Sequence, residues 1–248
     1  MIRLLASVRD RGEALAAASG GADFIDLKEP SDGALGGLPP ARIREIVAAL
    51  RDAHPALPLS ATIGDHPADA ADEIDARVDA VGACGVDYVK VGVAGGDTRA
   101  QRALLARLAD SPWAVVPVFI ADRGLDPALV EAACELPFPA LMADTEDKRA
   151  GSLFDCVSEA ALAAFVERVR GAGKLVGLSG ALREHHLPRL ALLAPDFAGF
   201  RGALCHGPRT GVLDPDALRS VRRALHRLSA RHSPCIDEGA RRIAPSLF

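Results

Sequence analysis

The chain has 248 residues, of which 49% are hydrophobic and 25% charged, proportions that fit an ordinary globular protein and exclude a largely disordered one. Its formal net charge of −4 and its pI near 6.0 argue against a general nucleic-acid binder, which normally has a basic face. The five cysteines form no CxxC pair and follow no secretory leader, and no run of about 20 apolar residues occurs. We therefore expect a cytoplasmic protein with reduced thiols and no membrane segment.

Apolar runs of strand character alternate along the chain with alanine-rich segments of helical spacing. Strands are expected at 3–8, 24–27, 59–64, 87–93, 114–121 and 140–145, and within the segments 174–182 and 197–204, each of which ends in a glycine turn. Helices are expected near 10–19, 39–53, 71–83, 97–109, 126–135, 158–171, 184–193 and 215–230. About eight such units on a parallel sheet predict an α/β fold, a single (β/α)₈ TIM barrel over 1–232, better than they predict an open sheet. Residues 233–248 lose the periodicity and are expected to form a short irregular C-terminal tail.

Lys28 is the first candidate catalytic residue. It follows the short apolar strand at 24–27, and Pro30, Gly33, Gly36 and Gly37 then prevent a regular continuation. A lysine at the carboxyl end of a buried strand can lose its proton in a dry pocket, and the neutral amine can then form a Schiff base with a carbonyl. A solvated lysine at a strand end is the alternative interpretation.

In a barrel the carboxyl ends of all strands share one face, so distant residues can converge there. Lys28, Lys90, Asp144 and the loop residue Lys148 are expected to do so. A salt-bridge network at the barrel mouth would explain the same pattern, although valines flank Lys90 on both sides. We read the four residues as a candidate catalytic group.

Two glycine turns follow the last two expected strands, LSGAL at 178–182 and FRGAL at 200–204. Barrels often bind phosphate at this position through backbone N–H groups. The predicted phosphate-binding residues are Gly180, Ala181, Arg201, Gly202 and Ala203. Either turn alone is weak evidence, because glycine after a strand is common for conformational reasons.

The histidines carry less information. His185 and His186 are adjacent, lack the spacing by which one helical face grips a metal, and are expected on the surface. His206, in the loop after the last strand, could contact phosphate or be an ordinary loop residue. No Cys/His cluster supports a metal site, and no nucleotide-binding glycine fingerprint is present.

Six segments in the same order together resemble one known family, the (5-formylfuran-3-yl)methyl phosphate synthases of methanofuran biosynthesis. They are DLKEP with its SDGALGG loop, SATIGD, DYVKVGV, MADTEDKRAGSLFDC, LSGAL and GFRGALC. The resemblance runs from about residue 3 to the last helix and leaves out only the tail.

The resemblance implies a lyase that joins two molecules of glyceraldehyde 3-phosphate and releases one phosphate and two waters, with no cofactor. It implies that Lys28 is the Schiff-base residue, that Lys90 is the proton acceptor, and that Asp144 and Lys148 are further active-site residues. A small sugar phosphate is then the expected partner, with no nucleic acid and no membrane, and the protein is expected to be a homo-oligomer. Replacing Lys90 with methionine is expected to leave the fold intact or even more stable and to slow furan formation by at least about 10²-fold.

Two alternatives stay open from the residues alone. One is a class I aldolase or an isomerase acting on another sugar phosphate, since Schiff-base lysines and phosphate turns occur in such barrels. The other is a catalytically inactive barrel that serves as a binding subunit. Four polar residues at buried or half-buried positions argue against the second, because a scaffold gains nothing from their desolvation.

Overall fold

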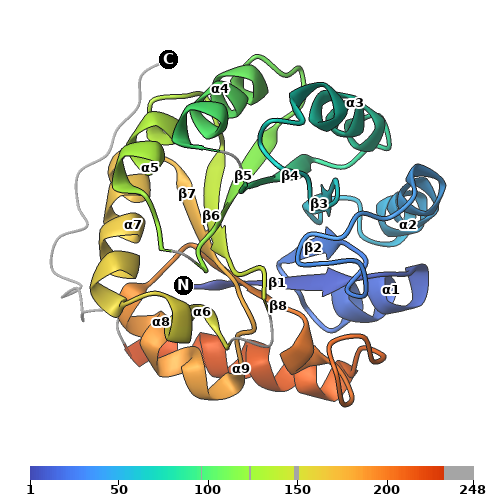
Figure 1. Cartoon of the computed structure of the whole chain (residues 1–248). Helices are drawn as coiled ribbons and strands as arrows, with labels where there is room; N and C mark the ends of the chain where they lie inside the picture. The colour runs from blue at the N-terminus through green and yellow to red at the C-terminus, as the bar shows by residue number, and fades with distance from the viewer. Residues whose placement is uncertain (96, 123, 148–150, 232–248) are drawn as a thin grey trace, which may run out of the picture.

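The computed structural model describes residues 1–95, 97–122, 124–147 and 151–231. Parallel strands alternate with helices along the chain, and the helices form a ring outside the strands (Figure 1). The strands are β1 Arg3–Val8, β2 Phe24–Leu27, β3 Leu59–Thr62, β4 Tyr88–Val93, β5 Val115–Ile120, β6 Ala140–Asp144, β7 Leu175–Leu178 and β8 Phe197–Phe200. The helices are α1 Arg11–Ser19, α2 Pro40–Ala53, α3 Ala71–Gly82, α4 Thr98–Ala109, α5 Pro127–Cys134, α6 Leu153–Cys156, α7 Glu159–Gly171, α8 Leu187–Leu193 and α9 Pro215–Arg231, with 3₁₀ turns η1 Glu184–His186 and η2 Gly202–Leu204.

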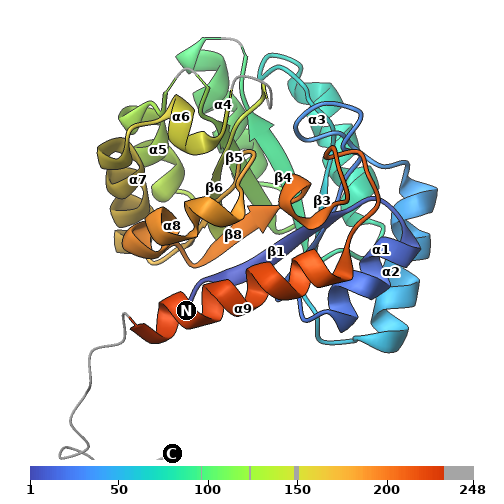
Figure 2. The same ribbon diagram turned by 90° about the horizontal axis from the view of Figure 1, so that it is seen from below.

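The sheet closes on itself. Each strand pairs in parallel with the next, and β1 pairs with β8 with Arg3 opposite Phe197. The TIM barrel expected from the alternation is therefore confirmed. Helix α9 runs along the outside beside the strand that begins the barrel (Figure 2).

Side chains alternate between the two faces of each strand. In β2, Ile25 and Leu27 point outward into the large core between strands and helices, whereas Phe24 packs with the smaller cluster inside the barrel. Because strand side chains have a period of two, Asp26 and Lys28 share the inward face with Phe24. The strand thus directs two ionisable groups into the barrel.

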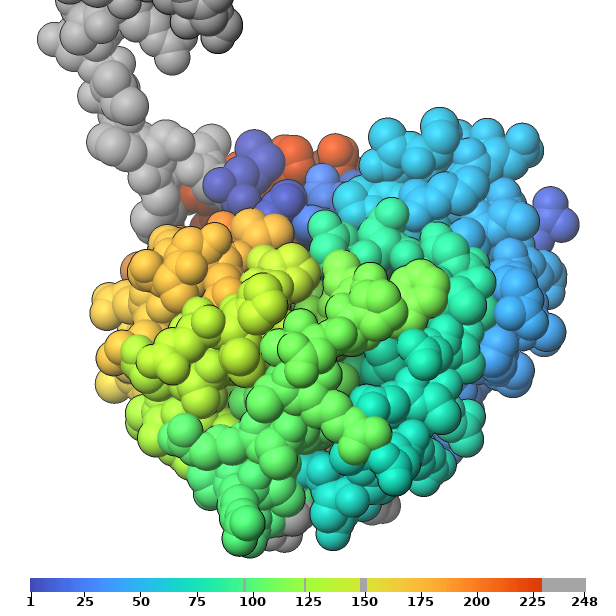
Figure 3. Space-filling view, turned by 90° about the horizontal axis from the view of Figure 1, so that it is seen from above, coloured from blue at the N-terminus to red at the C-terminus, as the bar shows by residue number. Residues whose placement is uncertain are grey.

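The helices cover the strands with apolar faces of ordinary helical spacing. In α2 the buried residues are Ile43, Ile46, Val47 and Leu50, which is the i, i+3, i+4, i+7 pattern of a helix packed on one side. The middle of the chain, coloured cyan to yellow-green, forms one face of the outer surface (Figure 3). The helices thus cover the outside of the barrel, and polar side chains can gather in its interior and at its mouth.

The loop between β2 and α2 enters the barrel. Ala34 and Leu35 are each 1% exposed and belong to the interior cluster with Val118 and Met142. A Cβ atom on Gly92 would lie 2.9 Å from Leu35 Cδ1, so the glycine leaves room for the leucine. The part of this loop from Ala34 to Gly36 is therefore a buried plug above β4, whereas Ser31, Asp32 and Gly33 are exposed.

Two details differ from the expectations. Strands β3 and β5 end earlier than expected, at Thr62 and Ile120, whereas β7 and β8 end at Leu178 and Phe200, where the expected glycine turns begin. The short helix α6 was not predicted, although Ser152 and Asp155 form a capping box at its start. The tail at 233–248 lies outside the described residues.

Candidate active site

A cavity of about 250 Å³ opens at the carboxyl ends of the strands. Of the four predicted catalytic residues, Lys28, Lys90 and Asp144 line it, and Lys148 lies outside the described residues. The remaining lining residues are Leu5, Ser7, Asp26, Met142, Ser179, Gly180, Ala181, Leu182, Arg183, Gly199, Phe200, Arg201, Gly202 and Arg209. The structure thus brings together three polar residues that are more than 50 positions apart in the sequence.

Lys28 stands at the end of β2 and is 6% exposed. Its Nζ donates a hydrogen bond of 3.1 Å to the carbonyl oxygen of Ala34, in the buried plug. The Lys28 backbone N–H donates to Val8 of the neighbouring strand. The sheet therefore fixes the backbone of Lys28, and the loop holds its amine.

Lys90 is paired with a residue that the sequence analysis did not single out. Its Nζ lies 3.0 Å from Asp26 Oδ1, and the two side chains are 4% and 1% exposed. Asp26 also accepts hydrogen bonds from Ser60 at 2.7 Å and from Ser7 at 3.1 Å. Four adjacent strands thus contribute to one buried polar cluster made of Ser7, Asp26, Ser60 and Lys90.

The charge on Asp26 follows from this environment. Burial raises the pKa of its carboxyl, whereas the nearby Lys90 and Lys28 charges and the Ser60 hydroxyl lower it. The lowering effects together are larger, so the net shift is downward from the ordinary 3.8. Asp26 is therefore a carboxylate at neutral pH. It supplies a negative charge that is paired with Lys90 and close enough to Lys28 to interact with it.

Asp144 ends β6 on the far side of the cavity and is 3% exposed. Its Oδ1 accepts a hydrogen bond of 2.7 Å from the backbone N–H of Thr145. That bond turns the carboxylate back along the end of its own strand. Asp144 thus presents its side chain to the cavity from opposite the Asp26 cluster.

The two predicted phosphate turns have different geometry. Gly180 has a φ of +115° and Ala181 a φ of 47°, and no acceptor for their N–H groups occurs among the described residues. After β8, Gly202 and Ala203 begin the turn η2, whose first N–H groups have no acceptor within the turn. Gly180, Ala181 and Gly202 line the cavity, whereas Ala203 is not among its lining residues.

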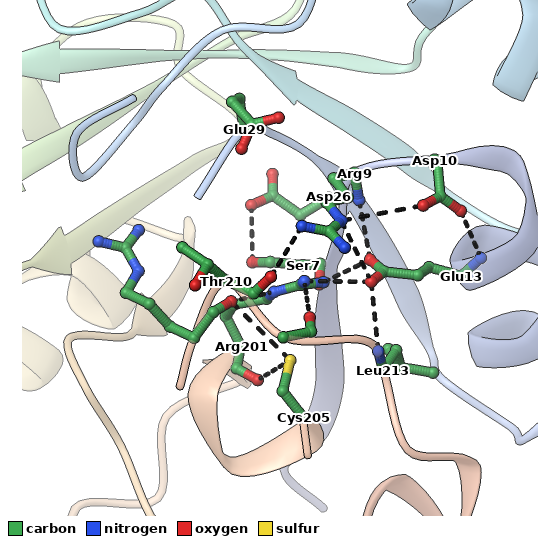
Figure 4. A network of polar contacts seen from close by, with 12 residues as sticks. Ser7, Arg9, Asp10, Glu13, Asp26, Glu29, Arg201, Cys205, Thr210 and Leu213 are labelled. Atoms are coloured by element: carbon green, nitrogen blue, oxygen red, sulfur yellow. Dashed lines mark hydrogen bonds and ion pairs between the residues drawn. The ribbon is translucent and has the colours of Figure 1, made fainter. Parts of the chain in front are cut away.

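Arg201 lines the cavity but is heavily engaged (Figure 4). Both of its terminal nitrogens pair with the carboxylate of Glu13 in α1, and both residues are buried. Its remaining donors reach the carbonyl oxygens of Ser7, Arg209 and Gly211. An arginine has five N–H donors, so Arg201 could reach an anion only by giving up one of these bonds.

Three charged residues of the cavity were not predicted from the sequence, Asp26, Arg183 and Arg209. Strand alternation could have found Asp26, because it lies two residues before Lys28 and so points the same way. No periodic signal marks Arg183 or Arg209, since both lie in loops.

The prediction that His186 lies on the surface is wrong. Its side chain is 7% exposed, packs near the Phe154 ring, and accepts a hydrogen bond of 3.0 Å from the backbone N–H of Arg183. Burial, with the neighbouring His185, lowers the pKa of its imidazole. His185 is exposed, as expected. His206 is exposed and lies 3.4 Å from the Asp214 carboxylate.

A second hollow, of about 500 Å³, lies over the ends of β4 and β5. Four carboxylates line it, those of Asp65, Asp122, Asp126 and Glu146. Like charges repel, so an anionic substrate is better accommodated in the smaller cavity, whose lining includes two lysines and three arginines.

Within the described ranges, no group of three or more His, Cys, Asp or Glu side chains could hold a metal ion, and no helix is long and apolar enough to span a bilayer.

Comparison with solved structures supports the barrel alone. A 3-hexulose-6-phosphate synthase from Salmonella typhimurium superposes with a TM-score of 0.62 at 16% identity, covering 92% of this chain and 100% of that one. A phosphoribosyl anthranilate isomerase from Thermus thermophilus gives 0.59 at 17% identity, covering 93% and 99%. At such low identity these similarities establish the fold and leave the chemistry open.

Comparison with protein sequences is more specific. The family model described as 4-HFC-P synthase matches residues 4–222. A Methylorubrum extorquens protein, named provisionally as a (5-formylfuran-3-yl)methyl phosphate synthase, is 40% identical over 206 residues, 82% of each chain. The protein so named in Methanopyrus kandleri is 36% identical, over 90% of this chain and 98% of its own, and that of Methanocaldococcus jannaschii 33% identical, over 88% and 97%. The chain belongs to the 4-HFC-P synthase family.

Proposed function

We propose that this protein condenses two molecules of glyceraldehyde 3-phosphate into (5-formylfuran-3-yl)methyl phosphate, with release of one phosphate and two waters. The observation that carries the proposal is the pair of buried lysines, Lys28 and Lys90, which line one cavity with the Asp26 carboxylate. Membership of the synthase family supports the same reaction. The product would enter methanofuran biosynthesis.

Lys28 is proposed as the nucleophile. Its neutral amine would attack the aldehyde carbon of one triose phosphate. The adduct would lose water to form an iminium, which withdraws electrons from the adjacent carbon. The buried position excludes bulk water, which would otherwise hydrolyse the iminium. The plug loop that holds Nζ through Ala34 fixes the direction of attack.

Lys90 is proposed to transfer protons at the carbon next to the iminium. Its amine is held by Asp26, and Ser7 and Ser60 fix that carboxylate in turn. A well-placed general base typically contributes about 10²–10⁴-fold to a rate. Asp26 would position the Lys90 amine and balance the positive charge that develops at Lys28.

Asp144 and Lys148 are proposed to assist the eliminations. Forming the furan ring from two three-carbon units requires oxygen to leave as water and as phosphate, and each departure needs a proton or a cation at the leaving oxygen. Asp144 reaches the cavity from the side opposite Asp26, so it can act on a different atom of the substrate. The backbone N–H groups at Gly180, Ala181 and Gly202, which line the cavity, are proposed to bind phosphate.

The covalent step can be tested directly. Incubation with glyceraldehyde 3-phosphate and borohydride is expected to attach a three-carbon unit to Lys28, detected by peptide mass spectrometry. In the absence of borohydride a furan aldehyde should accumulate, followed by its ultraviolet absorbance. A label on Lys90 with Lys28 unmodified would reverse the two roles.

A class I aldolase acting on another sugar phosphate would also use a buried lysine. The two reactions differ in their products, since an aldolase releases neither phosphate nor a furan. Measuring inorganic phosphate alongside absorbance separates them, because the proposed reaction yields one phosphate for each furan.

A further inference from the structure

Arg209 differs from Arg201, although both line the cavity. Arg201 is 7% exposed and spends its five donors on Glu13 and on three carbonyl oxygens, two of them in the loop between β8 and α9. Figure 4 shows its guanidinium between Glu13 and the segment that contains Thr210. Arg201 therefore fixes the loop that carries Arg209.

The Arg209 guanidinium is half-buried and lightly bonded. Its Nη2 donates a hydrogen bond of 3.0 Å to the carbonyl oxygen of Gly33, in the plug loop that also holds Lys28. No carboxylate among the described residues forms an ion pair with it. Burial lowers its pKa, which the more distant Asp144 charge opposes, yet an arginine stays protonated in proteins. A half-buried cation without an ion pair is costly until an anion joins it.

The chemistry of the site supplies such an anion. Two triose phosphates bring two phosphate groups, and their mutual repulsion requires separate cationic or N–H-rich positions. One is available at the glycine turns after β7 and β8. Arg183, the third arginine of the lining, is exposed and donates to the carbonyl of Gly202 at 2.7 Å, so it lies beside those turns. Arg209 lies instead against the Lys28 loop.

We propose that Arg209 binds the phosphate of a triose phosphate at the mouth of the cavity, next to the loop that holds Lys28. This inference rests on the proposed function, because it takes the substrate to be a phosphorylated aldehyde. Its planar guanidinium can offer two parallel N–H donors to phosphate oxygens. The residue makes the site select phosphorylated aldehydes over free ones.

The test separates phosphate recognition from the chemistry of Lys28. Calorimetry with inorganic phosphate alone is expected to show at least tenfold weaker binding to Arg209→Gln than to the parent, with partial recovery in Arg209→Lys, which keeps the charge but not the fork. Arg42→Gln, an exposed arginine of α2, serves as the matched control and should bind phosphate as the parent does. An unchanged isotherm for Arg209→Gln overturns the proposal.

A second measurement uses two aldehydes. Borohydride trapping by Arg209→Gln should slow at least tenfold with limiting glyceraldehyde 3-phosphate and stay at the parent rate with unphosphorylated glyceraldehyde. Equal slowing of trapping with both aldehydes would show that Arg209 only holds the plug loop in place through the Gly33 carbonyl, and would overturn the proposal. If the parent traps neither aldehyde, the proposed function fails, and the phosphate isotherms still decide the role of Arg209.

Discussion

The Asp26–Lys90 pair explains a lysine that the sequence left without a partner. A charged amine between valines is unfavourable inside a barrel unless a counter-charge lies beside it, and Asp26 lies 3.0 Å away. The partner also alters the expected effect of removing the amine. A methionine at position 90 would leave the Asp26 carboxylate buried with only Lys28 as a nearby cation, so the fold should lose stability.

We therefore predict that Lys90→Met and Asp26→Asn each lower the free energy of unfolding by about 3–5 kcal/mol, the usual cost of breaking a buried ion pair. The double variant should lose less than the sum, because it leaves neither charge unpaired. Urea denaturation of the parent, the two single variants and the double variant measures this double-mutant cycle. Glu45→Gln, which breaks an exposed pair with Arg42, should change the free energy by less than about 1 kcal/mol. Additive losses in the cycle would contradict the pairing.

The lowered pKa of Asp26 predicts acid sensitivity. A carboxyl whose pKa falls on folding stabilises the native state above its unfolded value, here 3.8, and that stabilisation disappears as the pH drops through the folded value. The free energy of unfolding, measured in urea between pH 7 and pH 3, should thus decline more steeply for the parent than for Asp26→Asn. Parallel curves would show that Asp26 contributes no pH dependence.

At the scale of elements, regular segments were easier to predict than the turns that bear function. The alternation of Ile25 and Leu27 with inward residues predicts β2, and the spacing of Ile43, Ile46 and Leu50 predicts α2, because each pattern reflects burial on one side. The ends of β3 and β5 were missed because side-chain periodicity does not encode the backbone angles that end a strand.

The candidate site divides in the same way. Lys28, Lys90 and Asp144 could be placed from strand ends, since the parallel order brings these ends together. One loop folds over α1, and this determines that the N–H donors of Arg201 are occupied whereas those of Arg209 can reach a substrate anion. No local pattern in the sequence specifies that contact.

The left-handed alanines give a prediction for the turn after β7. Ala181 and Ala194 both have a φ of 47°, a region that costs a non-glycine residue roughly 1–2 kcal/mol. Each replacement by glycine should stabilise the protein by up to about 1 kcal/mol, because the relief exceeds the added chain entropy of glycine. Thermal or urea unfolding measures this.

Only Ala181→Gly should also affect the reaction, by loosening the turn that lines the cavity and raising KM for the phosphorylated substrate. Ala194 follows α8 at the opposite end of the barrel, before β8, and serves as the matched control. A rise in KM for both variants would mean that flexibility acts globally and not through the turn.

At the scale of the whole molecule, the described residues close the barrel by themselves. The β1–β8 pairing and the packing of Leu218 and Val221 of α9 into the core complete the ring before residue 232. A chain ending at residue 232 is therefore expected to unfold at the same urea concentration as the full chain and to retain furan formation. Light scattering on both chains would test whether 233–248 contributes to the expected homo-oligomer. A lower unfolding midpoint would assign the tail a part in the fold.

The site also has an uneven origin along the chain. Asp26, Lys28 and Lys90 come from β2 and β4, whereas the glycine turns and Arg209 come from the segments after β7 and β8. The two lysines proposed for amine chemistry thus come from the first half of the chain, and the groups proposed to bind phosphate come from its last third. Evolution, or an engineer, could exchange the last quarter of the barrel to admit a different aldehyde while inheriting the reactive lysines unchanged.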